Sequence, residues 1–345
     1  MKASENNPFV KSLPVRLAGT LAIPVVAVAI MLIICGTSGK LGAISFPSFM
    51  SYTAVVMITT IALSINLNSG RFDFSLGSMA ILSSIISSQI SYSILGGGSG
   101  SAFLMLLLGV VCGAVLGALS GGLYVLLKIP PIITSLGVTL IYEGVSFTLT
   151  GGSYVRTEVQ NSSMDAFSTN WILPLIVIAV VLVIIVFLFD HTKFGYNYKA
   201  LREGQKVAVN TGIREIPNAI VCYIVCGALM GIVGFINATR NTNINGGSLN
   251  FGSIGIMFTA FLPMFIGGFI GRYSNDKLGY LLAAVTMSML NSTFAAFANE
   301  ISASTQSIIN AVLLVLFLIY LNNEGLIKDI VSFKWINKKA AGTGE

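Results

Sequence analysis

Ten runs of apolar residues, each long enough to cross a bilayer as a helix, dominate this sequence. A membrane-spanning helix needs about 20 predominantly apolar residues. Only 9% of the residues are charged, whereas soluble domains have about 25%, so most of the chain cannot face water. We therefore expect an all-α, polytopic membrane protein with helices over residues 17–36, 48–66, 75–95, 102–128, 131–149, 171–189, 217–238, 252–270, 278–297 and 304–322.

The distribution of lysine and arginine predicts the orientation of these spans. With ten spans, both termini lie on the same side, and sixteen of the nineteen basic residues fall on that side. The other side has only Lys40, Arg156 and Arg240. Because basic residues accumulate in cytoplasmic loops, we expect a single transmembrane domain over 1–345, with a cytoplasmic N-terminus (1–16), a membrane part (17–322) and a cytoplasmic tail (323–345).

Two short polar segments resemble each other. The segment "NSGRFDFSLG" (68–77) follows the second span, and "NGGSLNFGSI" (245–254) follows the seventh. Asn, Gly and Phe coincide at the first, third and seventh places. Segments five spans apart have opposite orientations, which is typical of transporters with inverted repeats, whose interrupted helices lie near the substrate path. Chance similarity over ten positions is the alternative.

The first of these segments has two interpretations. It is either an ordinary cytoplasmic loop, in which Ser75 caps the third span and Asp73 lies before its N-terminus, or a broken helix beside a translocation path, where glycines permit turns and protein or water satisfies the backbone. Candidate path residues are Asn66, Asn68, Asp73, Ser75, Glu143, Asn245 and Asn291. For Asn291, hydrogen bonding between helices is the favoured interpretation.

Glu143 is the outstanding charge within an apolar run. A charged side chain at the centre of a membrane helix costs about 2.5–3.5 kcal/mol on insertion scales. Such a residue faces a cavity, is paired or is protonated. The alternatives to a path role are a position nearer the outer end of its span and an internal ion pair.

The segment 190–218 between the sixth and seventh spans carries five basic and three acidic residues. Its centre contains two stretches that can each form a short helix, hinged around Glu203 and Gly204. It is either a solvated loop or a docking element for a cytoplasmic partner.

Signals for catalysis are missing from the sequence. There is no GxxxxGK[ST] run for ATP, no His/Cys/carboxylate cluster with metal spacing, and a single histidine, His191. We expect no enzyme site, no cofactor and no metal in this chain. The four cysteines and the small-residue run "GVVCGAVLGALSGG" (109–122) indicate close helix packing.

Three segments resemble the permease subunits of ribose/xylose/galactose-type ABC importers. "SINLNSGRFDFSLGSMAILSS" is similar to their "GGIDLSVGS" signature, "KIPPIITSLGVTLIYEGVSFTLTGG" (128–152) to their segment after the fourth span, and "TKFGYNYKALREGQKVAVNTGI" (192–213) to their cytoplasmic coupling loop. The resemblance covers residues 50 to 322.

The resemblance implies a type II importer fold with ten spans and an internal inverted repeat, in the bacterial cytoplasmic membrane. It also implies a second permease subunit, a cytoplasmic ATP-binding subunit that carries the ATP and magnesium, and an extracytoplasmic solute-binding protein, which would dock on segments 150–170 and 239–252. By position, the coupling loop includes Tyr198, Leu201, Glu203, Gly204, Ala208 and Gly212, and the signature includes Asp73, Ser75 and Gly77.

The chain departs from the family pattern at several points. Arg71 and Phe72 replace the usual Gly-Ile of the signature, and Glu143 stands where many relatives have a basic residue. These departures leave the solute open among sugars, polyols, nucleosides and other small polar molecules. The alternative functions are an ion-coupled secondary transporter using Glu143 and Asp73, and a membrane enzyme or scaffold.

Overall fold

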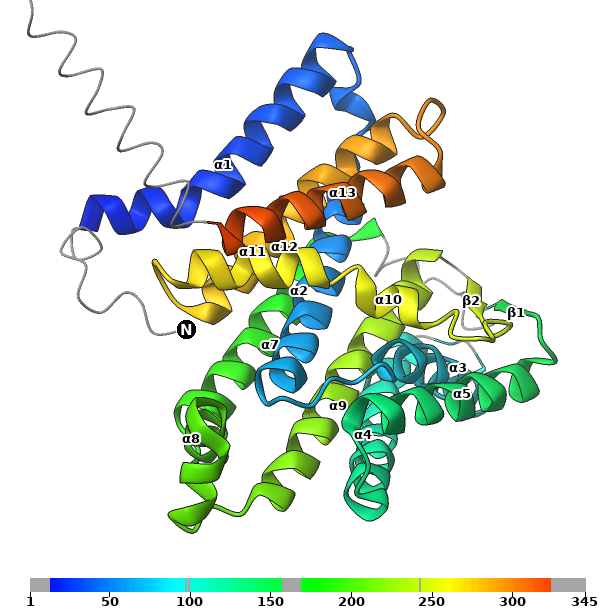
Figure 1. Cartoon of the computed structure of the whole chain (residues 1–345). Helices are drawn as coiled ribbons and strands as arrows, with labels where there is room; N and C mark the ends of the chain where they lie inside the picture. The colour runs from blue at the N-terminus through cyan, green and yellow to red at the C-terminus, as the bar shows by residue number, and fades with distance from the viewer. Residues whose placement is uncertain (1–12, 97, 99, 157–168, 242, 324–345) are drawn as a thin grey trace, which may run out of the picture. The chain divides into compact units, whose positions relative to one another are not determined.

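The computed structural model describes residues 13–96, 98, 100–156, 169–241 and 243–323 (Figure 1). Chain contacts divide it into two compact units, Met1–Ala296 and Phe297–Glu345, and each is described by itself. The predictions for 1–12 and 324–345 lie outside the described residues, and the single domain over 1–345 stays a prediction.

Ten helical segments of the described chain are long and apolar enough to cross a membrane, which confirms the predicted all-α, multi-pass architecture. In the first unit they are α1 (Leu13–Thr37), α2 (Phe46–Asn68), α3 (Leu76–Leu95), α4 (Ser101–Leu127), α5 (Pro131–Thr150), α7 (Ile172–Asp190), α9 (Glu215–Asn241), α10 (Ile254–Phe258) continued by α11 (Phe261–Gly271), and α12 (Asp276–Ala296). The second unit contains α13 (Ala303–Asn322). A 3₁₀ turn, η2 (Leu41–Ala43), precedes α2.

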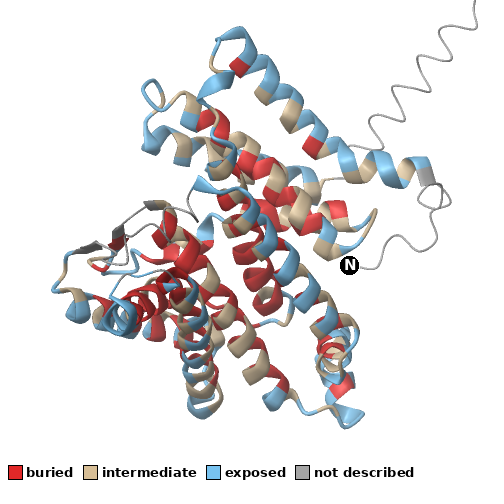
Figure 2. Ribbon diagram, turned by 180° about the vertical axis from the view of Figure 1, so that it is seen from behind, coloured by how far each residue is buried: buried red, intermediate tan, exposed pale blue. Residues whose placement is uncertain are grey.

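The first unit is built around α2, which is buried on nearly all sides and packs against α7, α9, α11 and α12. Many other helices are buried on one face and exposed on the other, as the red and pale-blue faces in Figure 2 show. The exposed faces carry leucine, isoleucine, valine and phenylalanine. A large apolar exterior is unfavourable in water and suits hydrocarbon, so the chain is a multi-pass membrane protein.

Helices α4 and α9 are in the closest contact. A Cβ atom added at Gly113 would lie 2.2 Å from the carbonyl oxygen of Gly227, and one at Gly231 would lie 2.0 Å from that of Gly109. Only glycine allows two helix backbones to approach this closely. The predicted close packing of 109–122 is confirmed.

The serine-rich third span is a regular helix despite its polar composition. The hydroxyls of Ser78, Ser83, Ser84 and Ser87 each donate to the carbonyl three residues earlier, which for Ser78 is that of Ser75, just before α3. These bonds satisfy the hydroxyls within the helix, which allows the serines to be buried.

The eighth span differs from the single helix expected over 252–270. It is interrupted at Thr259 and Ala260, between α10 and α11. Pro263, in the first turn of α11, has no N–H to donate to Thr259 and its ring disfavours a continuous helix there. The span is therefore a short segment followed by a longer one.

Two short strands connect distant loops. β1 (Tyr154–Arg156) pairs antiparallel with β2 (Asn243–Asn245). These strands lie within the segments 150–170 and 239–252, for which the sequence predicts a common docking role. The structure brings the described parts of both segments together.

Candidate functional site

The loop between α2 and α3 is organised around the carboxylate of Asp73. This side chain is 0% exposed. Its Oδ1 accepts hydrogen bonds from the backbone N–H of Ser75 (2.9 Å) and from the Ser75 hydroxyl (2.6 Å), while its Oδ2 accepts one from Asn66 Nδ2 (3.4 Å). Because Ser75 immediately precedes α3, the negative charge lies at the positive end of that helix. Gly70, with φ of +73°, permits the turn.

The loop before α10 has the same chemistry, but its carboxylate comes from another helix. Glu143, 2% exposed, projects from α5. Its Oε1 accepts from the backbone N–H (2.8 Å) and hydroxyl (2.6 Å) of Ser253, and its Oε2 accepts from the N–H of Phe251 (2.9 Å). Ser253 immediately precedes α10. Of the alternatives for Glu143, the structure shows a buried carboxylate that binds the start of a broken helix.

Backbone conformation marks this second loop as strained. Asn250 and Phe251 have φ angles of +55° and +67°. Positive φ is uncommon for residues other than glycine, and for a bulky residue such as phenylalanine it persists only where its surroundings hold it. The bond from the Phe251 N–H to Glu143 is one such restraint.

The two loops touch each other. A Cβ atom added at Gly77, in the first turn of α3, would lie 2.0 Å from the carbonyl oxygen of Ser253. The starts of α3 and α10 are therefore in backbone contact. The starts of both helices and the loops before them form one site, which we call the paired breaks: residues 69–77 and 246–258, with Glu143. Asp73, Ser75, Glu143 and Ser253 are its buried polar residues.

Phenylalanines border the paired breaks. The ring centroids of Phe72 and Phe74 are 4.6 Å apart, Phe72 lies 5.8 Å from Phe261, and Phe74 lies 6.3 Å from Phe258. Phe258 is 53% exposed. This cluster was not predicted from the sequence, although Phe72 and Phe74, two residues apart, were a local signal for it.

The other predicted path residues are more dispersed. Asn66 is buried beside Asp73, and its Oδ1 has no partner. Asn68 is exposed at the end of α2, and Asn245 is exposed in β2, where its side chain accepts from the Gly247 N–H. Asn291 lies on α12 and is partly buried. The structure thus joins Asn66, Asp73, Ser75 and Glu143 at the paired breaks. A path role for the seven residues stays a prediction.

The segment after α7 forms α8 (Lys193–Asn210), which is kinked at Gly204 (φ −176°, ψ 89°). This confirms two short helices hinged at Glu203 and Gly204. Tyr198, Leu201 and Ala208 are buried, and the Tyr198 hydroxyl donates to the Ile65 carbonyl of α2 (3.0 Å). Gly212, with φ of +92°, allows the turn into α9.

The outer side of α8 and the start of α9 carries exposed residues. Glu203 is exposed, and so are the apolar side chains of Val207 (69%), Val209 and Ile216. Of the six residues predicted for the coupling loop, three therefore support the fold, whereas Glu203 and Gly212 are accessible. The exposure of Val207 and Val209 was not predicted from the sequence. The short helix after the kink has one buried residue, Ala208, which is too few to indicate which of its faces is exposed.

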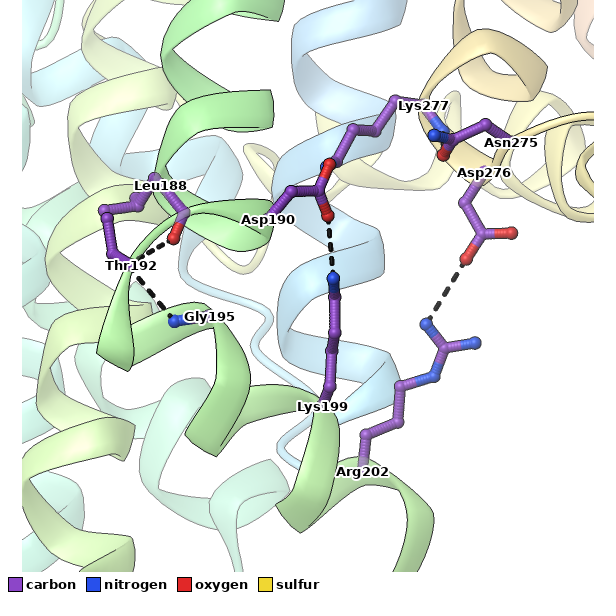
Figure 3. Close-up of polar contacts among 9 residues, drawn as sticks. All are labelled: Leu188, Asp190, Thr192, Gly195, Lys199, Arg202, Asn275, Asp276 and Lys277. Carbon is purple, nitrogen blue, oxygen red and sulfur yellow. Dashed lines mark hydrogen bonds and ion pairs between the residues drawn. The ribbon is translucent and has the colours of Figure 1, made fainter.

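Ion pairs fix α8 to its neighbours (Figure 3). Asp190, at the end of α7, binds Lys199 of α8 (2.7 Å) and also Lys277 of α12. Arg202 of α8 pairs with Asp276 at the start of α12 (3.3 Å). The first turn of α8 is capped by Thr192, whose hydroxyl accepts from the Gly195 N–H. One side of α8 is therefore held against α7 and α12, while the other is free.

Replacing Asp190 by asparagine is expected to loosen α8. The change removes the charge that Lys199 and Lys277 share, and the Lys277 side chain is only 14% exposed. Loss of hydrogen bonds to a charged group typically costs about 1.5–3 kcal/mol. Limited proteolysis should cut the 193–212 segment faster. Asp276→Asn is the matched control: its pair with Arg202 is 40–46% exposed, so its loss should cost at most about 1 kcal/mol. Equal cleavage of the two variants would contradict the prediction.

Curated proteins similar to this chain are transport permeases. The autoinducer 2 import system permease protein LsrC of Photorhabdus laumondii is 25% identical over 285 residues, covering 76% of this chain and 80% of the relative. The ribose import permease protein RbsC of Escherichia coli is 22% identical over 285 residues (80% and 85%). The D-allose transport system permease protein AlsC of Escherichia coli is 24% identical over 308 residues (81% and 89%).

No solved structure matches this chain. The matched part of the sequence, residues 47–320, runs from the start of α2 into α13 and includes the paired breaks and α8. Over these residues the chain matches the model of a transport permease family. The protein therefore belongs to the family described as the branched-chain amino acid transport system / permease component.

Proposed function

We propose that the chain is the permease subunit of an ATP-binding-cassette importer in the bacterial cytoplasmic membrane, with both termini in the cytoplasm. It forms the translocation path, and a separate subunit binds and hydrolyses ATP with magnesium. The chain itself carries no catalytic residue and no cofactor. The observation that carries the proposal is α8: a kinked helix outside the spans, fixed on one side by ion pairs and exposed on the other.

The solute that we propose is a sugar or a similarly small, uncharged polar molecule. Two of the relatives are named for ribose and D-allose, whereas the family description names branched-chain amino acids. An amino acid is zwitterionic, and its carboxylate is well bound by free N–H groups at the N-terminus of a broken helix. The carboxylates at the paired breaks already accept hydrogen bonds from helix N-termini, which favours the uncharged solute.

The same bonds weigh against the ion-coupled alternative. A carrier carboxylate must bind and release its ion during each cycle. Asp73 and Glu143 are instead each held by a serine N–H and hydroxyl, and releasing these bonds would leave buried donors unsatisfied. The permease relatives support the importer as well.

An internal inverted repeat relates the two halves in this proposal. Its support is the pairing of a carboxylate with the serine that precedes α3 (Ser75) and with the serine that precedes α10 (Ser253). These two helices follow spans that end on opposite sides of a ten-span protein. Because their starts touch, the two breaks lie within the membrane thickness, where the protein satisfies their backbone groups.

Three partners complete the importer. The ATP-binding subunit docks on the exposed side of α8 around Glu203 and Val207, the solute-binding protein docks on the outer segments joined by β1 and β2, and a second permease, identical or homologous, completes the path. In alternating access, closure of the ATP-binding subunits moves α8 and rocks the permeases about the path.

The first experiment measures ATP hydrolysis by the reconstituted complex with candidate ATP-binding and solute-binding proteins, across sugars, polyols, nucleosides and branched-chain amino acids. We expect stimulation by one pair of binding protein and solute. Deletion of 200–212 or Glu203→Ala should abolish it. Uptake that needs no ATP and follows a proton or sodium gradient would overturn the proposal.

Val207→Asp should weaken binding of the ATP-binding subunit at least about tenfold. The new charge would lose its hydration in an apolar contact, which should cost more than the roughly 1.4 kcal/mol that corresponds to a tenfold change in Kd. Pull-down of the two subunits measures this. Val207→Ile, which keeps the side chain β-branched and apolar, should bind within about threefold. Equal binding of Val207→Asp and wild type would show that the subunit docks elsewhere.

A further inference from the structure

Arg71 is a buried arginine whose guanidinium has one partner and two nitrogens without a partner. It is 3% exposed, and its Nη2 lies 3.2 Å from Oε1 of Glu215. Its Nε and Nη1 are buried without a hydrogen-bond partner. Burial of an arginine is costly unless the charge is paired. The bonds of Asp73 to the start of α3 do not explain why an arginine is buried in the loop before that helix.

Glu215 connects this arginine to α8. It lies in the first turn of α9, where a carboxylate is favourable for the helix dipole. The same Oε1 that faces Arg71 also accepts a hydrogen bond from Gln205 Nε2. Gln205 directly follows the kink at Gly204 and is exposed. One carboxylate oxygen therefore joins the outer half of α8 to the loop before α3.

The contacts continue from Arg71 into the paired breaks. The Arg71 backbone N–H donates to the Asn66 carbonyl (2.9 Å), and the Asn66 side chain donates to Asp73. Asp73 in turn holds Ser75 at the start of α3, two residues before Gly77 meets Ser253. Displacing the guanidinium displaces the base of this loop.

We propose that Arg71 is a positioning residue that transmits movement of α8, through Glu215 and Gln205, to the paired breaks. The inference rests on the proposed function. The two nitrogens of the guanidinium that have no partner, Nε and Nη1, give it hydrogen-bonding capacity for a second arrangement of the ion pair, as an element with two discrete states requires. The link depends on the ion pair between Arg71 and Glu215, so we expect it to depend on the positive charge at position 71 more than on the shape of that side chain.

The first test measures solute transported per ATP hydrolysed in the reconstituted importer. In Arg71→Gln we expect this ratio to fall at least about tenfold, while ATP hydrolysis stays within about twofold. Arg71→Lys, which keeps the charge, should restore most of the ratio. The double variant Arg71→Gln/Glu215→Gln should be no worse than either single variant, because the two act as a unit. Arg16→Gln, which removes a surface hydrogen bond from α1 to the Tyr273 carbonyl, should leave the ratio unchanged.

Two results of this assay would overturn the inference. One is a parallel loss of hydrolysis and transport in Arg71→Gln, which indicates a folding defect. The other is additive effects of the Arg71 and Glu215 variants.

A second test does not depend on import. In the purified chain, Gln205→Ala should accelerate amide hydrogen exchange at residues 70–76 by at least about tenfold without lowering the unfolding temperature, since Gln205 is exposed. Gln306→Ala should leave this exchange unchanged. If exchange at 70–76 is the same in Gln205→Ala and wild type, the inference is wrong even for a proven importer. If no partner supports import but the exchange changes as expected, the proposed function fails and the link from α8 to the breaks stands.

Discussion

Glu143→Ala is expected to destabilise the protein by about 3–5 kcal/mol, the usual cost of removing one partner from a buried charged network. The substitution leaves the N–H groups of Phe251 and Ser253 and the Ser253 hydroxyl without their acceptor. It also releases the restraint on the positive φ of Phe251. In detergent, the thermal midpoint should fall by about 10 °C.

Glu143→Gln provides a graded test of the same contacts. A glutamine carbonyl can take the position of Oε1 and keep both bonds from Ser253. Its amide NH₂ then faces the N–H of Phe251, so two donors oppose each other. We expect Glu143→Gln to be less stable than wild type and more stable than Glu143→Ala. The exposed Glu203→Ala is the control and should stay within about 0.5 kcal/mol of wild type.

The Glu143 variants also separate the two transport mechanisms. If the carboxylate is a structural cap, transport by Glu143→Gln should decline only in proportion to the folded protein. If the carboxylate carries an ion, transport should stop while the protein stays folded. A Glu143→Ala variant as stable as wild type would show that the carboxylate does not hold α10.

The parts of the site that the sequence predicts are those that local contacts determine. Asp73 lies two residues before Ser75, so its place before the helix N-terminus is visible in the order of residues. The predicted cap by Ser75 is wrong, because the Ser75 hydroxyl donates to Asp73 and makes no cap hydrogen bond of its own. The kink at Gly204 follows from a glycine between two helical stretches. The ten spans follow from the length of the apolar runs, because backbone groups in hydrocarbon must be satisfied within a helix.

Contacts between distant segments could not be predicted in this way. Glu143 and Ser253 are 110 residues apart, and no spacing rule joins them. The partner of Arg71 is 144 residues away. The sequence indicated that Glu143 needs a partner, since a bare charge in an apolar run is costly. Which group Glu143 binds depends on how α5 packs against the loop before α10.

Gly77→Ala is expected to have the second large effect, because it acts on the contact between the two breaks. The new Cβ atom would lie 2.0 Å from the Ser253 carbonyl oxygen, far inside van der Waals contact. The obstacle is backbone, so no rotation of a side chain relieves it. Overpacking of this kind costs about 1–3 kcal/mol and occasionally more. We expect a lower thermal midpoint, a lower yield in membranes and loss of transport.

Gly144→Ala is the matched control, since a Cβ at Gly144 meets nothing within 4 Å. Within α5, alanine is favoured over glycine by about 1 kcal/mol, so this variant should be as stable as wild type or more so. If Gly77→Ala matches it, the breaks are not in contact. If only Gly77→Ala loses stability, the close approach of α3 and the loop before α10 is part of the folded protein. The contact between Gly77 and Ser253 joins the starts of two helices that are each preceded by a serine bound to a buried carboxylate, Ser75 to Asp73 and Ser253 to Glu143.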